Sequence, residues 1–229
     1  SAYLCKADLA SQMVGEFPEL QGTMGYHYAR QNREPRGVST AIAEHYLPKH
    51  AGDKLPTSQS GKILAVADRI DTLTGIFSAG EEPTGEKDPY ALRRAALGVI
   101  RILIEKKLPL DLVRLVDLSI LTYEENDHDI DQNTRARVIQ FIFDRYQGYF
   151  GSKGFTKDEI NAVLEVGTVP PFDFYRRLQA VSRFRRHKSA QSLSEANKRV
   201  RNILRKASQD IPFEIDSALF EFAAEEILA

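Results

Sequence analysis

Two short carboxylates, Asp68 and Asp71, are the first residues whose type and spacing could do chemistry. In a helix over residues 65–77, which advances about 100° per residue, they share one face with Leu64 and Gly75. The apolar stripe that such a helix would bury lies on another face and consists of Ile63, Val66, Ala67, Ile70, Leu73 and Phe77. A carboxylate on the cleft side of a buried helix can ligate a metal ion or hold a basic partner.

The string Ala67-Asp68-Arg69-Ile70 resembles the closing aspartate helix of HD-domain phosphohydrolases. Those enzymes bind metal through a His, a His-Asp pair and a later Asp. Here the His-Asp dipeptide is His128-Asp129, which follows Asp68 and lies in an acidic connector. Because a divalent metal would lack enough ligands to hold a reactive water, we expect an HD-like scaffold without metal chemistry. Asp68 is therefore only a weak candidate ligand, and an ion pair with an arginine or a helix cap is its favoured role.

Other reactive side chains lack the partners that catalysis requires. His45 is expected to be a partly buried packing residue, and Cys5 has no neighbouring base in the sequence to activate it. Gly22-Thr23-Met24-Gly25 is too weak a pattern for a phosphate loop. We therefore predict no catalytic residue and no cofactor in this chain.

Basic residues give the strongest binding signal. Residues 183–206 hold nine Lys or Arg and one acid, Glu195. On a predicted helix through Val200, a row of polar and basic residues lies opposite the apolar side at spacings of three and four, which suits a phosphate backbone. The row consists of Lys198, Arg201, Asn202 and Arg205, and Arg183, Arg185, Arg186 and Lys188 precede it. The alternative is a solvated face whose charge is offset by the acidic residues Glu221, Glu225 and Glu226.

A second, smaller basic face is predicted upstream. Arg93, Arg94 and Arg101 belong to one predicted helix, and Arg94 and Arg101 are a heptad apart. They could contact RNA or neutralise Asp68 and Asp71, and the sequence leaves both roles open.

Length and composition bound the class of protein. The chain has 229 residues, of which 42% are hydrophobic and 28% charged, so it can bury a core as one large or two modest domains. A single cysteine, Cys5, excludes an internal disulfide and indicates the cytoplasm. No apolar run approaches the ~20 residues of a membrane span. The chain opens without a Met, which indicates a piece of a longer protein.

Helical periodicity and helical start signals run through almost the whole chain, so we predict an all-α fold. Ser39 or Thr40 is expected to cap a short helix that ends at Pro48, and Ser58 to cap the helix that carries Asp68. Asp88-Pro89 predicts the start of a helix that runs to about Lys107. Its inward residues are expected to be Leu92, Ala96, Val99 and Leu103.

A boundary is predicted at the acidic segment 124–129, after a helix that Pro109 is expected to begin. The predicted domains are therefore residues 1–125 and 126–229. Beyond the boundary we expect a helix over 138–149, a capping box at Thr156–Glu159, a helix marked by Phe174, Leu178 and Val181, a long helix whose core residues are Leu193, Ala196, Val200, Ile203 and Leu204, and a last helix from about Asp216.

Several strings together resemble the β subunit of the bacterial heterotetrameric glycyl-tRNA synthetase. They are Lys6-Ala7-Asp8-Leu9, Met13-Val14, Gln21-Gly22-Thr23-Met24-Gly25, and residues 65–73, 87–99 and 196–204. In that family the α subunit carries the active site for glycine, ATP and Mg, and the β subunit supplies tRNA recognition. The resemblance implies that residues 1–125 form an HD-like domain and residues 126–229 a helical body that leads into an incomplete anticodon-binding region.

The resemblance also implies the partners, which are glycine tRNA and the α subunit of a heterotetramer, with no DNA and no membrane. The matched residues Arg93, Arg94, Lys198, Arg199 and Arg201 become candidates for RNA contact or for structure. Such a fragment is expected to be inactive alone. Two other hypotheses are an active HD-type metal-dependent phosphohydrolase and a structural helical adaptor that binds the α subunit.

Overall fold

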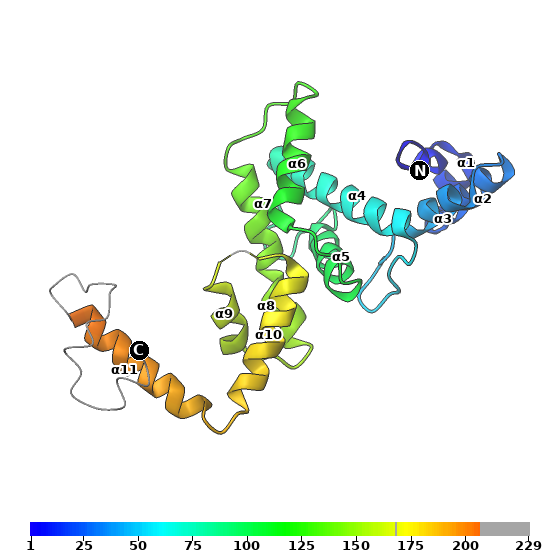
Figure 1. Cartoon of the computed structure of the whole chain (residues 1–229). Helices are drawn as coiled ribbons and strands as arrows, with labels where there is room; N and C mark the ends of the chain where they lie inside the picture. The colour runs from blue at the N-terminus through cyan, green and yellow to red at the C-terminus, as the bar shows by residue number, and fades with distance from the viewer. Residues whose placement is uncertain (168, 207–229) are drawn as a thin grey trace. The chain divides into compact units, whose positions relative to one another are not determined.

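The protein is described here from a computed structural model, which describes residues 1–167 and 169–206 (Figure 1). Within these residues it is all-α, as predicted, and the β contacts that it contains amount to one isolated bridge between Thr84 and Lys87. The chain divides into two compact units, Ser1–Ser182 and Arg183–Ala229. The predicted last helix from Asp216 lies outside the described residues.

The first unit holds three short 3₁₀ helices and the α-helices up to most of α10. The 3₁₀ helices are η1 (Ala2–Leu4), η2 (Ala7–Ala10) and η3 (Pro18–Leu20). The α-helices are α1 (Gln12–Glu16), α2 (Thr23–Gln31), α3 (Arg36–Glu44), α4 (Gln59–Ser78), α5 (Leu92–Glu105), α6 (Leu112–Glu124), α7 (Thr134–Phe143), α8 (Arg145–Gly151), α9 (Lys157–Leu164) and α10 (Pro171–Arg185). In the second unit, α11 spans Ala190–Lys206.

The core of the first unit forms where α4 packs against α5, α6 and α7. The four predicted inward residues of α5 are all fully buried, which confirms its apolar face. The same core continues into α8 and α10, where Tyr146, Phe150 and Phe174 pack with ring centroids 4.7–5.3 Å apart. The segment that joins α6 to α7 therefore separates two helices that share one core, and the division at residue 125 stays a prediction about domains.

The buried face of α4 differs from the predicted stripe. Ile63 is 56% exposed and Ala67 is also exposed, whereas Leu64 packs with Cys5 and Ala41. The reason is that α4 is covered on more than one side, by α3 as well as by α5, α6 and α7. A single amphipathic stripe underestimates the buried arc of such a helix.

Some helix starts are confirmed and others are wrong. Ser58 caps α4 by accepting a hydrogen bond from the Gly61 amide, and Thr156 forms the predicted capping box of α9. α10 begins at Pro171 and contains Phe174, Leu178 and Val181, the residues that marked its predicted helix. By contrast, α3 begins after Pro35 and ends at Glu44, so neither Ser39 nor Thr40 is its cap.

Two further starts are three residues late. The Asp88 carboxylate accepts hydrogen bonds from the amides of Leu92 (2.8 Å) and Arg93 (3.0 Å), so it caps α5 from outside. Likewise α6 begins at Leu112, after its cap Asp111, and not at Pro109. The predicted helix over 138–149 is two helices, α7 and α8, which meet at Asp144.

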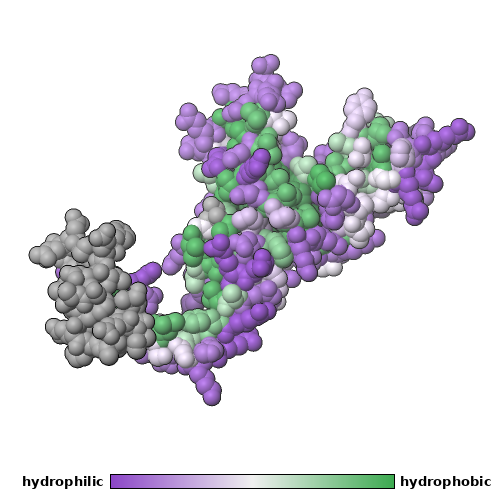
Figure 2. Space-filling model, viewed as in Figure 1, coloured by the Kyte–Doolittle hydropathy of each residue, from purple (hydrophilic) through white to green (hydrophobic). Residues whose placement is uncertain are grey.

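The exposed surface of the first unit is mainly hydrophilic, with hydrophobic residues gathered in smaller patches (Figure 2). Of the helices that the structure describes, not one combines the length and the apolar character that crossing a membrane requires.

Candidate functional site

Asp68 forms an ion pair with Lys6, whose Nζ lies 2.6 Å from Asp68 Oδ1. Burial lowers the pKa of Lys6, but the hydrogen bond and the charge of Asp68 outweigh it, so the pKa is raised overall. The predicted ion-pair role of Asp68 is therefore present, with a lysine in place of an arginine. Asp71 is exposed, and its backbone carbonyl accepts a hydrogen bond from the Tyr123 hydroxyl (3.3 Å).

The histidines are not gathered around Asp68 as a metal centre would require. His45 is completely buried, deeper than predicted, and its Nδ1 lies 2.7 Å from the carbonyl oxygen of Ile42. His128 is exposed and packs edge-on against the ring of Tyr123. Among the described residues, no group of three or more His, Cys, Asp and Glu could hold a metal ion. The residues in this part of the chain therefore do not fit the metal centre of an HD phosphohydrolase.

Arg69 is a structural residue whose role the sequence analysis missed. Its guanidinium is buried and donates to four backbone carbonyls, at 2.8 Å to His45, 2.8 Å to Ala65, 3.0 Å to Tyr46 and 3.2 Å to Pro48. Burial lowers its pKa. Four neutral acceptors satisfy this cation, and they fix the chain after α3 against α4.

The N-terminal sequence motifs that carry the resemblance lie where η2 contacts the start of α2. The buried Asp8 carboxylate accepts hydrogen bonds from the amides of Gly22 (2.7 Å) and Gly25 (3.1 Å) at the start of α2. A Cβ on Gly25 would lie 2.7 Å from Ile42, so only glycine fits. These contacts join η2 to the start of α2 and bring Gly25 close to Ile42 of α3.

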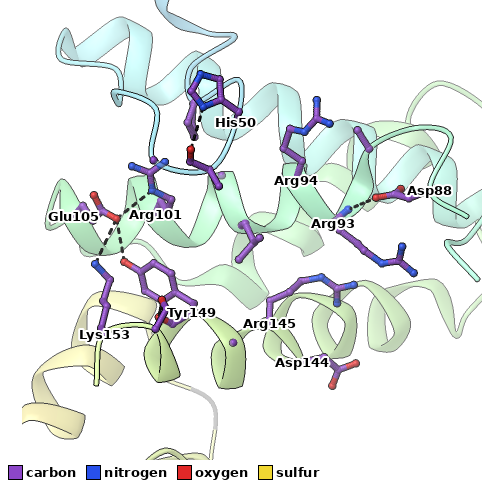
Figure 3. Close-up of a pocket in the computed structure, with 18 residues that line it drawn as sticks. His50, Asp88, Arg93, Arg94, Arg101, Glu105, Asp144, Arg145, Tyr149 and Lys153 are labelled. Atoms are coloured by element: carbon purple, nitrogen blue, oxygen red, sulfur yellow. Dashed lines mark hydrogen bonds and ion pairs between the residues drawn. The ribbon is translucent and has the colours of Figure 1, made fainter. Parts of the chain in front are cut away.

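A groove of about 1070 Å³ opens in the first unit between residues 48–52, α5 and α8 (Figure 3). Its charged residues are five cations, Arg93, Arg94, Arg101, Arg145 and Lys153, and three acids, Asp88, Glu105 and Asp144. The structure thus brings the predicted pair Arg93 and Arg94 together with two cations of another helix region that the sequence analysis did not select. Arg145 begins α8 and Lys153 follows its end, so no helical spacing in the sequence marks them as a pair.

At one end of this groove two cations share a single acid. Glu105 lies 3.2 Å from Arg101 Nε and 3.7 Å from Lys153 Nζ, and it accepts a hydrogen bond of 3.2 Å from the Tyr149 hydroxyl. Arg101 also donates to the carbonyl of Asp53 at 2.9 Å. In the described part of the chain Arg93, Arg94 and Arg101 form no ion pair with Asp68 or Asp71, so of the two roles left open by the sequence the neutralising one is not seen there.

The basic residues of 183–206 are exposed, as an interface requires. Six of them make no ion pair within the described ranges, namely Arg183, Arg186, Lys198, Arg199, Arg201 and Arg205. Arg185, the seventh candidate, is exposed as well. The one acid of the segment, Glu195, accepts a hydrogen bond from Gln191.

The predicted core residues of α11 are not buried. Leu193, Val200, Ile203 and Leu204 are 49–59% exposed, and Ala196 is exposed too. The amphipathic pattern therefore predicted the helix correctly but not the burial of its apolar side.

Comparison with known proteins places this geometry in a family. The family described as glycyl-tRNA synthetase beta subunit matches residues 1–165. The chain belongs to the glycyl-tRNA synthetase β-subunit family. Curated β subunits of glycine–tRNA ligase are 47% identical in Xanthomonas campestris pv. campestris (strain B100), over all of this chain, and 46% identical in Pseudomonas aeruginosa (strain LESB58), over 98% of it. A third, from Pasteurella multocida (strain Pm70), is 45% identical over 99% of the chain.

The chain spans about a third of the length of these β subunits. The share is 33% for the Xanthomonas and Pseudomonas proteins and 32% for the Pasteurella protein. The resemblance seen in the sequence is thus confirmed at the level of the family. The HD-like name of residues 1–125 and the individual RNA-contacting residues stay predictions.

Proposed function

We propose that this chain is a tRNA-binding and scaffolding part of a glycine–tRNA ligase in the cytoplasm. Its role would be to support the aminoacylation of glycine tRNA by an α subunit, which uses ATP and Mg²⁺. The observation that carries the proposal is the set of exposed cations in 183–206 that lack an acidic partner among the described residues. Membership of the β-subunit family supports the identity of the nucleic acid.

The geometry of α11 supports contact with a phosphate backbone. Lys198, Arg201 and Arg205 follow one another at intervals of three and four, so they line one side of the helix over about 10 Å. Exposed cations that form no ion pair keep their attraction for a polyanion, because no ion pair has to be broken on binding. A-form RNA offers its backbone and minor groove to such a helix more readily than its base edges.

The test is a double charge reversal, Lys198→Glu with Arg201→Glu, in the full-length β subunit. We expect tRNA affinity at low salt to fall at least tenfold. The matched control is Arg114→Glu with Lys157→Glu, which changes the net charge equally at exposed positions of α6 and α9. Unchanged affinity in the first variant, with circular dichroism showing intact helices, would remove α11 from the interface.

A second candidate function, an adaptor that binds the α subunit, is favoured by exposed apolar residues at the N-terminal end. Tyr3 is 97% exposed, and Leu9, Met13 and Phe17 are 42–47% exposed. Residues of this kind in one segment are typical of a protein interface. Size-exclusion chromatography of β subunit mixed with α subunit, with and without Tyr3→Ser and Phe17→Ser, tests this role separately from tRNA binding.

A further inference from the structure

The turn between α2 and α3, which we call the arginine turn, carries Arg30, Arg33 and Arg36 at intervals of three. All three are exposed, and none forms an ion pair or a side-chain hydrogen bond with another described residue. Glu34, which is half-buried, is the one acid in residues 20–43, so the turn has an excess of positive charge. The tip that α2 and α3 form, at the right of Figure 1, is hydrophilic in Figure 2.

The backbone of the arginine turn is fixed by the hydrogen bonds that end α2. The Glu34 amide donates to the carbonyl of Ala29 (2.9 Å) and the Arg33 amide to that of Arg30 (3.1 Å), which is the pattern of a Schellman motif. Arg33 takes the left-handed conformation of this motif, with a φ of 60°, where glycine is the usual residue. The arginines are thus attached to a backbone that does not have to be ordered on binding, which lowers the entropic cost of binding.

Local stability explains only part of the arginine turn. The helix dipole favours a cation at the end of a helix, which accounts for Arg30 and partly offsets the conformational cost at Arg33. Arg36 is the opposite case, because it is the first residue of α3, where the dipole disfavours a cation. The first turn of α3 contains no acid that would compensate this charge. Residues that contradict local preferences are expected mainly at functional sites.

The chemistry of the arginine turn suits a phosphate backbone better than a protein surface. A guanidinium presents a planar fork of donors that matches phosphate oxygens. Protein interfaces place large apolar side chains at their centre, but residues 18–62, all of which the structure describes, expose no large hydrophobic residue.

We propose that the arginine turn binds the phosphate backbone of an RNA, with Arg33 and Arg36 in direct contact. The inference rests on the proposed function for the identity of this RNA, which is glycine tRNA. It adds a contact surface in the first unit that is built from other residues than the basic segment 183–206.

The experiment uses the full-length β subunit and measures its affinity for glycine tRNA at about 0.1 M salt, together with its Tm. The variants Arg33→Gly and Arg36→Glu should not weaken the fold, because glycine is favoured in the left-handed conformation and an acid at the start of a helix. Each has a matched control at an exposed position. Lys107→Gly makes the same change after the end of α5, where φ is 55°, and Lys157→Glu makes it at the first residue of α9.

We expect each arginine variant to lose about fivefold or more in tRNA affinity, the effect of roughly one phosphate contact at this salt concentration. Its Tm should be at least that of the native protein, and the two controls should keep the native affinity. Native affinity in both arginine variants would overturn the proposal. An equal loss in the controls would also overturn it, because the loss would then reflect net charge alone.

Size-exclusion chromatography of the same variants with the α subunit tests the alternative of a protein partner. Loss of α-subunit binding with native tRNA affinity would overturn the proposal in favour of a protein interface. The proposed function can fail or stand separately. If the double variant of Lys198 and Arg201 loses tRNA affinity while both arginine variants keep it, only the arginine turn is excluded. Absence of tRNA binding by the native β subunit would refute both.

Discussion

The guanidinium of Arg69 occupies the space that any side chain at Gly98 would need. A Cβ on Gly98 would come within 2.6 Å of Arg69 Nε and 3.0 Å of its Cδ. The same arginine holds the carbonyls of residues 45, 46 and 48. Pro48 and Gly98 both line the groove, so one buried cation fixes the crossing of α4 and α5 and one wall of the groove.

Replacing Gly98 by alanine should destabilise the protein by about 1–3 kcal/mol, because the added methyl overpacks a site that Arg69 fills. Urea unfolding followed by circular dichroism measures the change. Gly148→Ala is the matched control, since it lies in α8 and a Cβ there meets nothing within 4 Å. In that helix position alanine should be neutral or stabilising by up to about 1 kcal/mol. Equal losses in the two variants would contradict the close-packing explanation.

Helical periodicity and capping residues correctly predicted those features of the helices that depend on neighbouring residues. The buried face of α5, the Ser58 cap and the Thr156 capping box depend on residues within one or two turns. Such patterns are visible in the sequence because periodicity and capping act over three or four residues. The start of α5 was three residues off, because Asp88 reaches its amides from outside the helix.

Features that depend on distant residues were not predicted. Arg69 donates to carbonyls that lie 21–24 residues away in the sequence. An arginine is usually exposed or paired with an acid, so its type alone does not predict burial among neutral carbonyls. The groove likewise lies between α5 and α8, and neither helix alone shows that its cations line one groove with those of the other. The grouping of cations across helices requires the tertiary fold.

The stability of the protein should fall as the pH drops below about 6.5, and His45 should be one cause. Burial lowers the pKa of His45, so the unfolded chain takes up a proton on this side chain at a pH where the folded chain does not. The neutral histidine therefore contributes stability that is present above pH 6.5 and is lost as the pH falls toward the lowered pKa. Urea unfolding between pH 7.5 and 5.0 should show a smaller loss in His45→Gln than in the native chain. His27→Gln, at an exposed position, should keep the native slope.

The link between α3 and the start of α4 depends on Glu44. Its carboxylate accepts hydrogen bonds from the Thr57 amide (3.0 Å), the Thr57 hydroxyl (2.6 Å) and the Ser58 amide (2.9 Å). Burial raises the pKa of Glu44, but these bonds and that of the Ser58 hydroxyl lower it overall. Glu44→Ala should cost about 1–3 kcal/mol of stability, whereas Glu86→Ala, at an exposed loop position, should cost almost nothing. A loss in Glu44→Ala no larger than in Glu86→Ala would show that the bonds are not stabilising.

If Lys198 contacts a phosphate of tRNA, its removal should change the salt dependence of binding. In the full-length β subunit, Lys198→Ala should reduce the slope of log affinity against log salt by about 0.7–0.9, the value of one phosphate contact. The preference for glycine tRNA over other tRNAs should stay the same, because a phosphate contact reads no base. Filter binding at several salt concentrations measures both. An altered preference with an unchanged slope would indicate a base contact instead.

The metal content of the purified protein distinguishes the proposed ligase function from the phosphohydrolase hypothesis. Asp68 already holds Lys6 at 2.6 Å, and a divalent ion at this carboxylate would have to displace that lysine. We therefore expect less than one equivalent of divalent metal in the purified full-length β subunit, and no change in its Tm on adding a chelator. Because Lys6 is half-exposed, Asp68→Asn should cost only about 0–1 kcal/mol. One equivalent of metal that Asp68→Asn abolishes, together with hydrolysis of a phosphoester by the native chain alone, would establish a metal enzyme instead.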